Sequence, residues 1–160
     1  MKKNNKQQKG ISVIEVVICI ALVMITFWSF TGIAKYSLKI QEQSKTKIEA
    51  INLASEAIEA VRSIRNESWD NISILSLETK YYPIISGNKW ILTLADPGLI
   101  NGMYDRSIII ERVYRDANDN ISESGTEDNQ TKKITALVEW ADRGQTKQID
   151  LITYLTNWNN

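Results

Sequence analysis

Glu15 raises the clearest chemical question in the chain. It is the only charged side chain in the apolar run of residues 11–34, ISVIEVVICIALVMITFWSFTGIA. A carboxylate inside a membrane-spanning helix costs about 3 kcal/mol on insertion scales, so such groups usually have a polar partner. Two interpretations remain open. Glu15 pairs with a cation, or it lies near the membrane surface and reaches water there.

A second stretch whose residue types could bind a ligand is the polar loop 115–131, RDANDNISESGTEDNQT. Four of its oxygen-bearing residues occupy the first, third, fifth and twelfth places of an EF-hand-like calcium loop: Asp116, Asn118, Asn120 and Glu127. Ile121 stands at the sixth place, where that loop needs glycine, and no helix pair is expected around it. We therefore interpret the segment as a solvated loop without a metal and keep calcium as the weaker alternative.

Composition narrows the function classes. The chain has no histidine, which excludes Ser-His and Cys-His nucleophilic sites and most catalytic zinc sites. Cys19 is the single cysteine, so no internal disulfide is possible, and we expect it to be inert packing. The 19 basic and 19 acidic residues balance, which gives no reason to expect nucleic acid as a partner. The prediction is a protein that is not an enzyme and has no cofactor.

The element that positions Glu15 is the run 11–34, about 36 Å long as a helix and thus able to cross a bilayer. The basic segment 1–10, MKKNNKQQKG, precedes it. One ordinary explanation is a secretory signal peptide cut near Ala34, although the run is longer than usual. Another is a plain signal anchor. Four lysines flank the run on each side, so the positive-inside rule does not decide its orientation.

The helical pattern continues beyond the apolar run. Apolar residues recur at three- and four-residue spacing over 35–65, with charged residues between them, which predicts an amphipathic helix with one face for a core. We expect one helix from about residue 11 to 65, roughly 80 Å long. Gly32 either bends this helix or allows close packing, and the sequence favours neither.

The segment 66–160 is predicted to be a β-rich head. Residues 81–86 and 89–95 flank a Gly-Asn turn, which indicates a hairpin. Further strand patterns cover 107–114, 134–140 and 148–156. The expected fold class is α+β, with one long helix packed on a small antiparallel sheet. The expected organisation is a basic leader (1–10), a membrane-crossing helix (11–34), its amphipathic continuation (35–65) and a β-rich head (66–160).

The stretch Lys9-Gly10-Ile11-Ser12-Val13-Ile14-Glu15-Val16-Val17 resembles the cleavage and methylation signature of type IV prepilins and type II secretion pseudopilins. That signature is a basic leader, a glycine, four mostly apolar residues, a glutamate and about twenty apolar residues. The resemblance implies that a membrane aspartyl protease cuts between Gly10 and Ile11 and methylates the new amine of Ile11. It also implies that Glu15 pairs with the N-terminal amine of a neighbouring subunit during assembly. Ile11 and Ser12 depart mildly from the commonest residues, phenylalanine and threonine.

The resemblance is specific over residues 9–34 and implies a pilin-like fold for the rest. A weaker likeness to minor subunits covers residues 60–70, where an arginine-rich helix end precedes a tryptophan. The implied function is that of a minor pilin or pseudopilin of a type IV pilus, competence pilus or type II secretion pseudopilus. Its partners would be other pilins or pseudopilins, the prepilin peptidase, the membrane assembly platform and the lipid bilayer. It would lie in the bacterial inner membrane with its head extracytoplasmic, and later in the filament.

An alternative of another class stays open. The chain could be a single-pass membrane-anchored extracytoplasmic binding domain that keeps its N-terminal segment and never polymerises. The mass of the mature N-terminus would distinguish the two, because only a prepilin loses residues 1–10.

Overall fold

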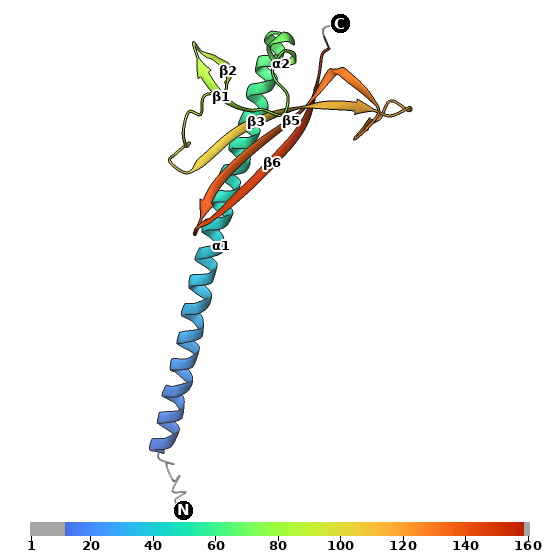
Figure 1. Ribbon diagram of the computed structural model, residues 1–160. Helices are drawn as coiled ribbons and strands as arrows, with labels where there is room; N and C mark the ends of the chain where they lie inside the picture. The colour runs from blue at the N-terminus through green and yellow to red at the C-terminus, as the bar shows by residue number, and fades with distance from the viewer. Residues whose placement is uncertain (1–11, 159–160) are drawn as a thin grey trace, which may run out of the picture. The chain divides into compact units, whose positions relative to one another are not determined.

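The computed structural model describes residues 12–158, so the leader and Ile11 lie outside the described part (Figure 1). The helices are α1 (Val13–Glu67) and α2 (Asp70–Ser73). The strands are β1 (Lys80–Ser86), β2 (Lys89–Thr93), β3 (Tyr104–Arg115), β4 (Ile121–Ser122), β5 (Thr126–Asp142) and β6 (Gln145–Thr156). The predicted α+β class, one long N-terminal helix followed by antiparallel strands, is confirmed.

The chain forms two compact units, one ending at Lys45 and the other beginning at Thr46. The first contains the apolar part of α1. The second contains the last turns of α1 together with α2 and the sheet. Each unit is described by itself below.

The sheet has the strand order β2-β1-β3-β5-β6, and β4 pairs with β3. All pairings are antiparallel. The two longest are β3 with β5, from Tyr104↔Trp140 to Arg112↔Lys132, and β5 with β6, from Thr131↔Thr156 to Asp142↔Gln145. The β1–β2 hairpin turns at Gly87 and Asn88, with φ of 58° and 63°. Two positive φ values in a two-residue turn match the twist of the flanking strands. The hairpin expected at this Gly-Asn pair is therefore confirmed.

One face of the sheet covers the last turns of α1 and forms the core. The helix contributes small residues at helical spacing, including Ala50, Ala54 and Ala57, each fully buried. The sheet contributes larger side chains at alternate positions of β3 and β5: Tyr104, Ile108, Ile110, Ile134, Ala136 and Val138. Alanine lets the helix axis approach the sheet closely, and the branched side chains fill the remaining volume. The predicted amphipathic second half of the helix is confirmed.

The polar segment 115–131 differs from the expected loop. β4 lies within it and β5 begins at Thr126, because the β3–β5 ladder resumes beyond a bulge with the pairs Tyr114↔Glu127 and Arg115↔Thr126. An ion pair of 2.8 Å between Arg115 Nε and Asp128 Oδ2 holds this extension. Backbone pairing gives the segment strand structure although its side chains are polar. The short helix α2, which buries Ile72, was not predicted from the sequence.

Candidate functional site

Glu15 lies in the first turn of α1, where its backbone N–H donates to the carbonyl of Ser12 at 3.0 Å. Its side chain is exposed, and no ion pair engages it within residues 12–158. An acidic side chain in the first turn is favourable because the backbone N–H groups there are unpaired. Gly10 and Ile11, the two residues at the predicted cleavage point, lie outside the described residues. Of that motif, the structure therefore places Glu15 at the start of the helix.

The surface around Glu15 is apolar on every side of α1. Val13 is 81% exposed and Trp28 is 83% exposed, and the apolar residues between them are also exposed. This part of α1 is long and apolar enough to cross a membrane, and none of it is buried within the protein. An exposed apolar surface of this extent is rare on monomeric soluble proteins and marks contact with a membrane or another protein.

Three hydroxyl side chains within this apolar part of α1 are hydrogen-bonded to its own backbone. The hydroxyls of Thr26 and Thr31 donate to carbonyls three residues back at 2.8 Å, and Ser29 donates to the carbonyl of Ile25 at 3.0 Å. Such bonds satisfy hydroxyl groups where water is absent. Gly32 does not interrupt α1, and a Cβ added there would meet nothing within 4 Å.

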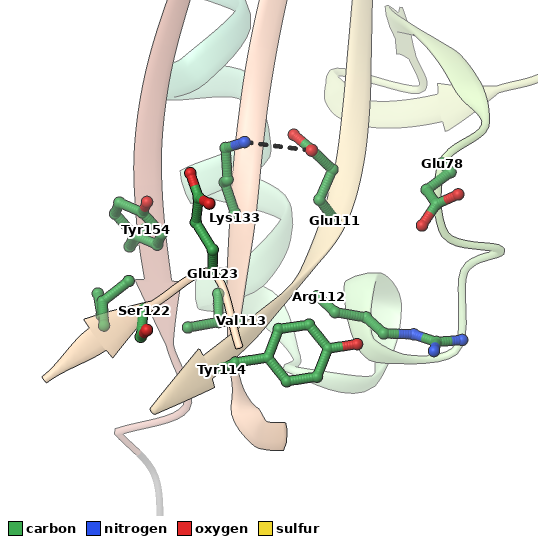
Figure 2. A pocket seen from close by; sticks show the side chains of 10 residues that line it. Glu78, Glu111, Arg112, Val113, Tyr114, Ser122, Glu123, Lys133 and Tyr154 are labelled. Atoms are coloured by element: carbon green, nitrogen blue, oxygen red, sulfur yellow. Dashed lines mark hydrogen bonds and ion pairs between the residues drawn. The ribbon is translucent and has the colours of Figure 1, made fainter. Parts of the chain in front are cut away.

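A hollow of about 460 Å³ lies in the second unit beside the bulge between Arg112 and Tyr114 (Figure 2). Its floor is a row across three paired strands, formed by Glu111, Lys133 and Tyr154. Their chain neighbours Ile110, Ile134 and Leu155 face the core, so this row lies on the opposite face of the sheet.

The charges in this hollow largely neutralise one another. The Lys133 ammonium lies 3.1 Å from Glu111 Oε1, and the Thr135 hydroxyl donates to Glu111 Oε2 at 2.8 Å. The hydrogen bond with Tyr114, followed by the charge of Glu127, raises the pKa of the Arg112 guanidinium. Paired charges and phenol rings suit contact with a polar surface. The row was not foreseen, because only strand pairing brings residues from three distant segments together.

Asp116, the first of the calcium candidates, is engaged by the backbone of its own turn. Both Asn118 and Asn120 donate their backbone N–H to Asp116 Oδ1, at 2.8 and 2.9 Å. These bonds lower the pKa of the Asp116 carboxyl, and the bond from Asn120 has the larger effect. Glu127 instead lies 3.8 Å from Arg112. Within residues 12–158, no group of three or more histidine, cysteine, aspartate or glutamate side chains could hold a metal ion.

Comparison with known proteins adds no relative. No protein-family model matches the chain, and neither a curated protein nor a solved structure matches it.

Proposed function

We propose that this chain is a structural subunit, a minor pilin or minor pseudopilin, which is cut after Gly10 and assembles through its N-terminal helix. The observation that carries the proposal is Glu15. It is the only acid in the apolar run 11–34, and it lies five residues after the glycine of a basic leader. Cleavage after Gly10 would create a cationic amine one helical turn away from it. An anion and a cation in an apolar medium stabilise each other and fix an axial position.

The two units support this assignment by what each can do. The first exposes apolar side chains all around and buries nothing, so it needs a lipid bilayer or neighbouring helices. The second has its own core, and every residue of that core belongs to the second unit itself. A subunit inserted in the bacterial inner membrane and later moved into a filament needs both properties. Its partners are then other such subunits, the prepilin peptidase and the assembly platform.

The first prediction concerns processing. In a bacterial host with a prepilin peptidase, the mature chain should begin at an N-methylated Ile11. The variant Gly10→Val should stay uncut, because a side chain at this position hinders close approach of the protease to the backbone. Intact-mass spectrometry of the membrane fraction measures both. Gly32→Val serves as the matched control and should be cut normally.

A mature chain beginning at Lys35 would replace the proposal with ordinary secretion. A full-length chain that keeps residues 1–10 in the presence of the peptidase would favour the second candidate, a membrane-anchored binding domain that does not polymerise. The hollows in the second unit are the observation that favours this candidate.

A further inference from the structure

A second cavity, of about 350 Å³, lies where four segments of the second unit meet. α1 contributes Glu56, the β1–β2 hairpin contributes Ile85 and Trp90, the loop after β2 contributes Leu99, and β3 contributes Arg106. Most of its walls are apolar. Ile85 and Leu99 are 64% and 58% exposed and form an apolar rim. This cavity is separate from the charged hollow on the opposite face of the sheet.

Arg106 is a cation at a core position. It alternates with Tyr104 and Ile108 on the helix-facing side of β3, and its side chain is only 8% exposed. Its Nη1 lies 3.1 Å from Glu56 Oε2, and its Nη2 donates to the carbonyl of Pro83 at 3.4 Å. Nη1 thus has an ionic partner in Glu56, whereas Nε makes no hydrogen bond within the described chain. A buried donor without an acceptor, such as this Nε, is costly and rare in native proteins, which sets this arginine apart from a packing residue.

The charges around the cavity restrict the ligand to a single negative charge. A guanidinium offers a planar fork of N–H donors that matches a carboxylate. Arg106 and Glu56 together carry no net charge, so a dianion such as a phosphate ester would meet repulsion from Glu56 without a second cation. Glu56 is 48% exposed and free to turn toward solvent when another carboxylate takes its place beside Arg106.

The walls restrict the rest of the ligand. The Arg106 Cζ lies 5.8 Å from the centre of the Trp90 ring, so a group bound to Arg106 would also contact this indole. With Ile85 and Leu99 at the rim, the cavity favours a compact apolar group next to the charge. Its volume is at the lower end of that found for small-molecule sites.

We propose that this cavity binds a monocarboxylate attached to a compact apolar group, with Arg106 holding the carboxylate and Trp90 contacting the apolar group. Two sources share this chemistry, a free aromatic or branched acid and the C-terminal residue of another protein. The inference goes beyond the proposed function, because binding is measured on the single chain and requires neither cleavage nor assembly.

The test uses the full chain in a non-ionic detergent and follows the indole N–H resonance of Trp90 by NMR. The probes are phenylacetate, its uncharged amide phenylacetamide, and the peptide acetyl-Ala-Ala-Phe with a free or an amidated C-terminus. We expect a saturable shift with phenylacetate and binding of phenylacetamide at least about tenfold weaker, because the amide lacks the charge. If the free-ended peptide binds as tightly as phenylacetate, the site receives chain ends. If only phenylacetate binds, it receives small acids.

Three variants separate recognition from folding. Arg106→Met should abolish the shift while the rest of the spectrum is kept, because methionine is apolar and Glu56, the partner left behind, is half-exposed and remains hydrated. Arg106→Lys keeps the charge but lacks the fork, and should bind about tenfold more weakly than wild type. Arg62→Met is the control, because this exposed arginine of α1 pairs with Glu59 away from the cavity, and it should bind like wild type. Equal affinity for acid and amide, or no saturable shift with any probe, would overturn the proposal.

Discussion

At the scale of single residues, the charge of Glu15 can be tested without changing the shape of its side chain. Glu15→Gln keeps the size of the side chain and removes its charge. If the charge serves assembly, the variant should be cut after Gly10, remain in the membrane and enter filaments poorly. Cross-linking to partner subunits, compared at equal membrane abundance, measures this. Equal incorporation of both forms would mean that Glu15 is simply an acid at the membrane surface.

Tyr104 stabilises the second unit through both its buried ring and its hydroxyl group. Its hydroxyl lies 3.1 Å from Glu49 Oε2 and 3.2 Å from the carbonyl of Thr46, and its ring is buried. Burial, then the hydrogen bond with Glu49, raises the pKa of the Tyr104 phenol. Tyr104→Phe should lower the free energy of unfolding by about 1 to 2 kcal/mol. Denaturant unfolding measures it, with the exposed Tyr36→Phe as the neutral control.

At the scale of elements, the fit between α1 and the sheet depends on small side chains. Ala54 is fully buried against the sheet, whereas its neighbour Ser55 is exposed on the same helix. Ala54→Leu should destabilise the second unit by about 1 to 3 kcal/mol, because the added atoms overpack the contact. Ser55→Leu should change its melting temperature little. Similar melting temperatures for the two variants would show that the contact accommodates larger residues.

The elements were predictable where one pattern dominates. The helix showed as an apolar run followed by regular apolar spacing, and the first hairpin showed as a Gly-Asn pair. The strand structure of residues 121–131 was not predictable, because its polar side chains carry no alternating pattern and pairing alone specifies it. Arg106 did leave a signal, a charge at an inward position between Tyr104 and Ile108. Its contact with Glu56 was hidden, because it depends on how the helix lies against the sheet.

At the scale of the whole chain, the division near Lys45 predicts independent folding of the second unit. Its buried apolar residues begin at Ala50, so the apolar segment contributes nothing to that core. Residues 46–160 expressed alone should be soluble, show mixed helix and strand signals by circular dichroism, and unfold in one cooperative transition. An aggregated fragment, or one without strand signal, would contradict this. The matched fragment 35–160 should melt at nearly the same temperature.

The alanine face of α1 has a consequence for the register between helix and sheet. Alanine methyls do not interlock with a sheet as larger side chains do, so they bring the surfaces close without fixing the helix along its axis. Polar contacts supply that position at three levels: Glu49 with Tyr104, Glu56 with Arg106, and Arg65, whose Nη1 donates to the carbonyl of Thr156 at 3.0 Å. Successive contacts are about two and about two and a half turns apart along the helix. A helix shifted by one turn would lose all three polar contacts, so these contacts favour the observed alignment of α1 on the sheet.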